Sequence, residues 1–189
     1  MARALAVIAS LAALAMSGVA CTRVLAPTGQ TVATAAATGP VATAREQQIA
    51  LDLVARVNAE REARGEKPLV ADSQLARRAF VWSEDMSQTG LHHSDLHPLL
   101  RTFVAAAENI GTGPRGTTAG ALHVAWMRSD SHRHDLLAPN LDRIGIGVVC
   151  MPDGTMWATQ EFASTRSGDF GPLPAAEPVA RRDAGTLTC

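Results

Sequence analysis

The sequence predicts an α/β fold in which the helices come first and a β-hairpin comes last. Three segments carry apolar residues at helical spacing, within residues 43–65, 72–89 and 118–128. From Ile144 to Val148 the pattern changes to alternation, with an apolar side chain at every second position. Helices and strands in this order are typical of a domain in which helices pack on a small sheet.

The first helix is predicted from its start signal and its apolar spacing. Thr43 and Glu46 form a capping box, which satisfies free N–H groups at a helix N-terminus. Apolar residues then recur four apart from Ile49 to Val57. The helix is expected to end near Gly65.

The second helix is predicted to begin after Asp72, a favourable N-cap residue, and to end before Gly90. Its core-facing residues are expected at spacings of three and four: Leu75, Ala79, Trp82 and Met86.

A third helix is predicted over residues 118–128, with three buried residues: Leu122, Ala125 and Trp126. A shorter helix or turn is expected over residues 131–137, before Pro139.

The last part of the domain is predicted to be a β-hairpin. Its first strand contains the alternation from Ile144, and its second runs from Met156 to Phe162. The segment 152–154, Pro-Asp-Gly, is a turn signal between them. No further strand is evident from the pattern.

The N-terminal residues 1–20 are predicted to be a signal peptide. Arg3 precedes an apolar run over residues 4–16, and small residues at 17–20 precede Cys21. This pattern indicates a bacterial lipoprotein signal, in which Cys21 is lipidated and anchors the protein to the cell membrane. The alternative is ordinary secretory cleavage, which leaves Cys21 as a thiol.

The remaining chain is predicted to contain one domain between two irregular segments. Residues 21–42 are rich in Thr, Ala, Gly and Pro and indicate a flexible linker. Residues 43–163 are expected to form the domain, and residues 164–189 an irregular tail. The net charge of −1 comes without a basic stripe, so nucleic acid is not an expected partner.

The chain has three cysteines. If Cys21 is acylated, Cys150 and Cys189 remain as an even pair, and a disulfide between them would join the tail to the domain. The alternatives are two unpaired thiols or an intermolecular link through the tail.

Several short segments, in this order, resemble the CAP superfamily (cysteine-rich secretory, antigen 5 and pathogenesis-related 1 proteins), in its bacterial SCP-like branch. The segments are Gly90–Ser94, Ala107–Ile110, Ala125–Leu137, Arg143–Val148 and Ala158–Gln160. The resemblance covers about residues 46–162. It implies an α-β-α sandwich, with a small antiparallel sheet flanked by helices.

The resemblance also implies a cleft lined by His93 and Glu108. An imidazole can bind a metal ion or exchange a proton near neutral pH, and a carboxylate can orient it. The bacterial branch adds His132, which is expected either as a further ligand or as a brace for the preceding helix. Glu108 has a structural alternative too, which is to accept backbone hydrogen bonds. A divalent metal such as zinc, held by His93 and His132, is therefore one expectation for the site.

The sequence departs from the eukaryotic CAP pattern at two cleft positions. Trp157 stands where a second histidine is expected. Arg128 and Ser129 follow the third helix where a second glutamate is expected.

The leading hypothesis is an exported, lipid-anchored binding module of the cell envelope, with a lipid, sterol or cell-wall ligand. The first alternative is a metal-dependent hydrolase or peptidase that uses His93 and Glu108. The second is a purely structural envelope protein.

Overall fold

The computed structural model describes residues 40–175 and 187–189, which belong to one compact unit. The predicted signal peptide, Cys21 and nearly all of the predicted linker lie outside the described residues. None of the helices in the described part of the chain has the length and apolar character needed to cross a membrane.

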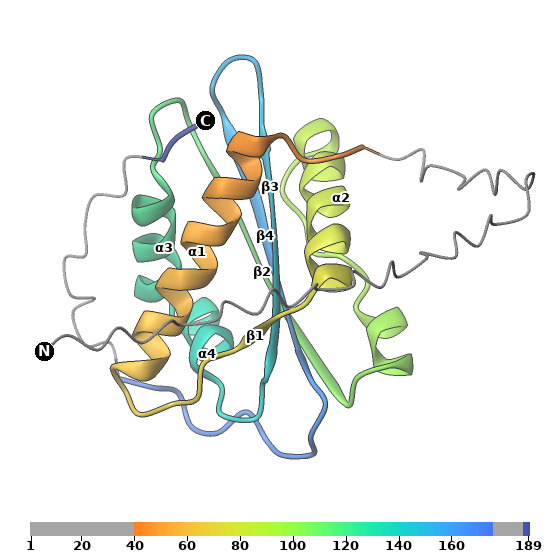
Figure 1. Cartoon of the computed structure of the whole chain (residues 1–189), viewed down its shortest axis with the longest axis vertical. Coiled ribbons are helices and arrows are strands. Elements are labelled where there is room, and N and C mark those ends of the chain that lie inside the picture. The colour runs from red at the N-terminus through yellow and green to blue at the C-terminus, as the bar shows by residue number, and fades with distance from the viewer. Residues whose placement is uncertain (1–39, 176–186) are drawn as a thin grey trace, which may run out of the picture. The chain divides into compact units, whose positions relative to one another are not determined.

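The described residues form a three-layer sandwich of helices around a four-stranded sheet (Figure 1). The helices are α1 (Ala44–Glu62), α2 (Ser73–Thr89), α3 (Ala119–Arg128) and α4 (Asp130–Leu137), with a short 3-10 helix η1 (His97–Arg101). The strands are β1 (Val70–Ala71), β2 (Ala105–Gly113), β3 (Arg143–Cys150) and β4 (Met156–Ser164). The predicted α-β-α class is confirmed.

The sheet has the strand order β1-β3-β4-β2. The pairs β3–β4 and β4–β2 are antiparallel, as expected, whereas the short β1 pairs with β3 in parallel and makes the sheet mixed. β1 was not predicted, since two residues are too short to show alternation. β2 was not predicted either, because its small residues show no apolar alternation.

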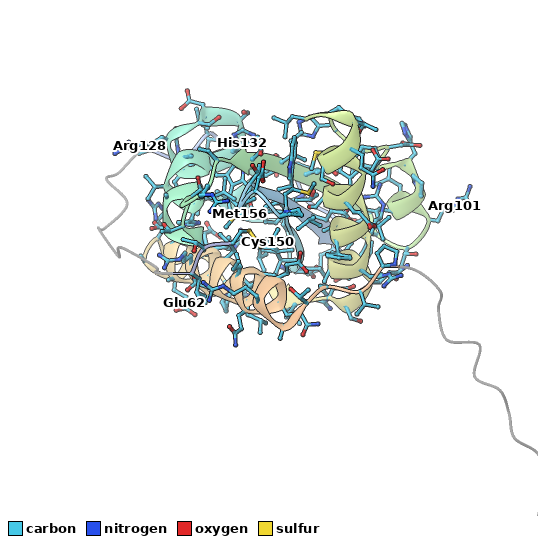
Figure 2. All side chains as sticks on the ribbon, turned by 90° about the horizontal axis from the view of Figure 1, so that it is seen from above. Glu62, Arg101, Arg128, His132, Cys150 and Met156 are labelled. Carbon is cyan, nitrogen blue, oxygen red and sulfur yellow. A yellow bond between two sulfur atoms is a disulfide. The ribbon has the colours of Figure 1, made fainter. Side chains whose placement is uncertain are left out.

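Each face of the sheet is covered by a different set of helices. α2 packs on β3 at Gly145 and Gly147, where the helix backbone lies so close to the strand that no side chain would fit. The apolar residues of β3 on the other face, Ile144, Ile146 and Val148, join the main core with α1, α3 and α4. Figure 2, a view at right angles, shows the side chains of α2 on one side of the sheet and those of α1 and α3 on the other.

The helix start signals act as the sequence predicts. Thr43 and Glu46 form both hydrogen bonds of the capping box, and the Asp72 carboxylate caps the first turn of α2. Two burial expectations were wrong. Trp82 is only half-buried, because the adjacent Ser83 faces the sheet, and Ala125 is exposed whereas His123 is buried in its helix.

A disulfide between Cys150 and Cys189 joins the C-terminus to the end of β3, with Cα atoms 5.2 Å apart. Arg45 donates a hydrogen bond to the Thr188 carbonyl, and Thr188 also pairs with Thr118. The C-terminus is therefore held beside the starts of α1 and α3. Residues 165–175 contain no helix or strand.

Candidate functional site

The structure brings His93 and Glu108 into direct contact. His93 lies in the loop after α2, and its Nδ1 is 2.8 Å from Oε1 of Glu108 on β2. The Ser94 backbone N–H donates to the same oxygen at 2.9 Å. The Glu108 side chain is 1% exposed, whereas that of His93 is 61% exposed. A buried carboxylate therefore holds a largely exposed imidazole.

Glu108 has a second carboxylate beside it. Glu161 on β4 is its direct partner in the antiparallel register, so both side chains project from the same face of the sheet. The Glu161 side chain is 0% exposed. The Oε2 atoms of both glutamates are buried without a hydrogen-bond partner among the described residues.

The environment of Glu161 raises its pKa well above the usual value for a carboxyl group. Burial raises the pKa of Glu161 to about 7, against the opposing effect of Arg78, and the charge of Glu108 adds to the rise. Glu161 is not among the site residues that the sequence predicts. Its signal was a charged residue inside the otherwise uncharged strand β4, directly after the Ala158–Gln160 segment.

Arg78 of α2 connects these carboxylates to the loop. Its guanidinium forms an ion pair with Glu161 and donates to Ser94 Oγ at 2.9 Å and to the Asp95 carbonyl. Ser94 is thus bound both to Glu108, through its N–H, and to Arg78, through its hydroxyl. The loop is attached to both glutamates.

The other side of the site comes from α4. The His132 backbone carbonyl accepts a hydrogen bond from Asn109 Nδ2, next to Glu108 on β2. Burial lowers the pKa of His132, and the charge of His93 lowers it further. Burial raises the pKa of Asp135 to about 6, against the effects of His134 and His93. Figure 2 places His132 on the side of the sheet opposite α2.

Glu108 and Asn109 are consecutive residues of strand β2. Asn109 is fully buried and also bonds Gln160 across the strand pair. Because successive strand residues point to opposite faces, Asn109 connects to α4 while Glu108 faces the α2 side. Because of this alternation, two adjacent residues of β2 contact the loop after α2 on one face of the sheet and α4 on the other.

The remaining histidines after α2 lie apart from Glu108. His92 stacks edge-on against Trp82, and its carbonyl accepts the Trp82 indole N–H. His97 is 90% exposed, and its ring bonds Asp95. Trp157 is half-buried on the same face of β4 as Glu161, four residues away.

The residues at the site do not assemble a metal-binding set in this arrangement. Within the described residues, no group of three or more His, Cys, Asp or Glu side chains is placed to hold a metal ion. Zinc sites in proteins use at least three protein ligands, so the geometry does not fit one formed around His93 and His132.

A separate apolar groove runs between α1 and α2 over the free part of the β3 edge. Its volume is about 170 Å³, and apolar lining residues include Ala50, Phe80 and Ile146. Pockets that enclose small-molecule ligands are usually about 300–1,000 Å³. The groove is therefore small for a whole lipid chain.

Sequence comparison gives two matches. The family model described as "CAP: Cysteine-rich secretory protein family" matches residues 54–162. The protein YkwD of Bacillus subtilis (strain 168) is 35% identical over 120 residues, which cover 58% of this chain and 45% of that protein. The chain thus spans less than half the length of this curated relative.

Three bacterial structures are similar in fold. An outer surface protein of Borrelia burgdorferi has a TM-score of 0.56 at 18% identity, over 67% of this chain and 97% of that one. A cysteine-rich secretory protein of Staphylococcus aureus has a TM-score of 0.53 at 24% identity, over 65% and 40% of the two chains. An extracellular protein with an SCP domain from Bacillus anthracis has a TM-score of 0.51 at 23% identity, over 67% and 45%.

Proposed function

This chain belongs to the cysteine-rich secretory protein (CAP) family, and we propose that it is an exported, lipid-anchored module that binds a cell-wall component. The binding position in this proposal is the His93–Glu108 site.

The proposal of export combines the predicted signal peptide with the nature of the relatives. Two of the similar structures are described as an outer surface protein and an extracellular protein. Lipidation of Cys21 is the part of the proposal that rests on the sequence pattern alone. A single anchored cysteine at the start of a linker would leave the domain free to reach the wall.

The observation that carries the binding role is the exposed imidazole of His93 held by the buried Glu108. A polar ring fixed in this way offers a directed hydrogen bond to a ligand outside the domain. The neighbouring groups, His132 and Asp135, are polar as well. A polymer with many hydroxyl and amide groups fits this surface better than an acyl chain or a sterol does.

The first test measures binding to isolated cell-wall sacculi, with a chain carrying Cys21→Ser so that no lipid is attached. We expect co-sedimentation with sacculi, and a loss of about tenfold in affinity for His93→Ala, which corresponds to one hydrogen bond. The matched control is His97→Ala, since His97 is an exposed histidine of the same loop region outside the site.

Each other result has a definite meaning for this proposal. Equal binding by the wild type and His93→Ala would remove the site from the proposal. Saturable binding to a fatty acid or sterol, with none to sacculi, would favour a lipid ligand. No binding to either would favour the purely structural envelope role.

The alternative of a metal-dependent hydrolase keeps its own test. Elemental analysis of protein prepared with zinc would have to find one ion per chain, lost in His93→Ala. Because the observed residues do not form a three-ligand set, we expect no stoichiometric zinc.

A further inference from the structure

We infer that Arg78 and Glu161 are positioning residues for His93, and that the site they set takes a ligand group that donates a hydrogen bond. The nature of the ligand rests on the proposed function. The positioning role is a property of the free chain and is tested without any ligand.

Arg78 attaches the His93 loop to the sheet. Its guanidinium bonds Glu161, Ser94 Oγ and the Asp95 carbonyl at once. These contacts hold the two residues that follow His93. A planar guanidinium with several fixed donors suits this multiple contact, whereas a lysine ammonium does not.

Glu161 in turn holds the Arg78 side chain in place. The Glu161 carboxylate is completely buried and rigidly placed by β4, whereas the Arg78 side chain is 26% exposed. The ion pair therefore anchors the more mobile partner to the sheet. Glu161 does not contact His93 through any observed hydrogen bond, so its role is exerted through Arg78.

The contact with Glu108 determines the tautomer of His93. Oε1 of Glu108 accepts the Ser94 N–H, so it is an acceptor, and a proton on this carboxyl group would lie on Oε2. His93 Nδ1 must then carry the hydrogen that bonds Oε1. In the neutral ring this leaves Nε2 as an unprotonated acceptor.

The ligand class follows from the free nitrogen. When the ring is neutral, Nε2 of this largely exposed imidazole accepts a hydrogen bond from a hydroxyl, amide or ammonium group. Carboxylates, phosphates and carbonyls have no hydrogen to donate to it. Among envelope components, the fitting groups are sugar hydroxyls and peptide amides.

The experiment reads the ring nitrogens of His93 by nitrogen-15 NMR in the purified full chain carrying Cys21→Ser. At a pH where the ring is neutral, we expect the Nδ1–H tautomer in the wild type. The double variant Arg78→Gln/Glu161→Gln removes both charges together, so no unpaired buried charge remains. In it we expect the Nδ1–H signature to give way to a mixture or to Nε2–H.

The matched control is Arg77→Gln, an arginine of the same helix turn whose guanidinium bonds only the Pro40 carbonyl within the described part of the chain. It should keep the wild-type tautomer. If the double variant does not fold, Ser94→Ala removes only the hydroxyl that Arg78 binds and should lower the Nδ1–H population. A wild-type tautomer in the folded double variant, or in Ser94→Ala if that is the variant measured, would overturn the positioning role.

Binding to isolated sacculi separates the positioning role from the proposed function. We expect the double variant to lose about tenfold in affinity while Arg77→Gln keeps it. A wild type that shows the Nδ1–H tautomer but does not bind sacculi would end the proposed function and leave the positioning role standing. Sacculus binding that is unchanged in a double variant with an altered tautomer would overturn the donor-group assignment.

Discussion

At the residue scale, Glu161 lies fully buried between the opposite charge of Arg78 and the like charge of Glu108. Its pKa is raised from 4.5 to about 7, so between these two pH values the folded protein keeps a proton that the unfolded chain has released. This group therefore stabilises the fold fully below pH 4.5, and the contribution is lost as the pH rises through 7.

This shift predicts a pH-dependent difference between the wild type and Glu161→Gln. Relative to the wild type, the variant should gain stability between pH 4.5 and pH 7 and above, by up to about 3 kcal/mol. Urea unfolding at a series of pH values measures this. Glu62→Gln, which changes an exposed glutamate of α1, should run parallel to the wild type. A parallel curve for Glu161→Gln would contradict the raised pKa.

Arg61 is the largest side chain that the structure buries completely. Its guanidinium donates to the carbonyls of Lys67, Leu136, Ala138 and Leu141, and so joins the end of α1 to the end of α4. Among the described residues no carboxylate bonds it, and burial lowers its pKa. Backbone carbonyls at the C-terminal end of α4 supply the negative potential instead.

Arg61→Met should therefore lower the free energy of unfolding by about 3 kcal/mol or more, because buried carbonyls lose their donors. Chemical denaturation measures the loss. Arg64→Met, which removes a partly exposed ion pair with Glu60 and a hydrogen bond to the Glu60 carbonyl in the preceding turn, should cost less than about 1 kcal/mol. Similar losses for the two variants would show that the buried arginine is not a structural clamp.

At the scale of elements, the contact between α2 and β3 depends on glycine. A Cβ atom at Gly147 would lie 2.0 Å from the backbone nitrogen of Phe80, and one at Gly145 would lie 2.1 Å from that of Ala76. The close packing of α2 on β3 brings Arg78 and the loop that contains His93 within reach of β4 and β2. The site therefore depends on residues that carry no functional group.

Gly147→Ala should destabilise the domain by about 3 kcal/mol, since a helix backbone cannot move aside as a side chain can. The control is Gly111→Ala on β2, where the atoms nearest to the new methyl group belong to the side chains of Leu122 and Trp126 and the loss should be smaller. Thermal unfolding of both variants decides the matter. A larger loss for Gly111→Ala would reverse the interpretation.

At the scale of the whole molecule, the disulfide closes a long stretch of chain. Cys150 and Cys189 are 39 residues apart in sequence. Closing a loop of that length contributes about 4 kcal/mol in the chain-entropy model. The bond also keeps Thr188 beside Arg45 and Thr118, at the starts of two helices.

Replacing both cysteines by serine should lower the melting temperature by about 10 °C. Differential scanning calorimetry with and without reductant measures this, and reduction of the wild type should match the double variant. Cys21→Ser lies outside the described residues and should leave the melting temperature unchanged. No effect of reduction would show that the tail is held by its other contacts.

The elements whose signals are local follow from the sequence. The capping box at Thr43, the N-cap at Asp72 and the turn before Met156 each depend on residues a few positions apart, and all three hold in the structure. The ordered segments also sufficed to identify the family. That resemblance also implied that His93 and Glu108 line a shared cleft.

Tertiary structure alone decided how the site is supported. Glu161 and Arg78 are 83 residues apart in sequence, and Glu108 meets Glu161 only through the register of β2 on β4. β2 itself has small residues without apolar alternation, so its place at the sheet edge depends on the strand beside it. The periodicity of a sequence predicts on which face of its own helix or strand a side chain lies. Which distant elements pair with each other depends on packing, and this pairing decides which charged side chains are buried together.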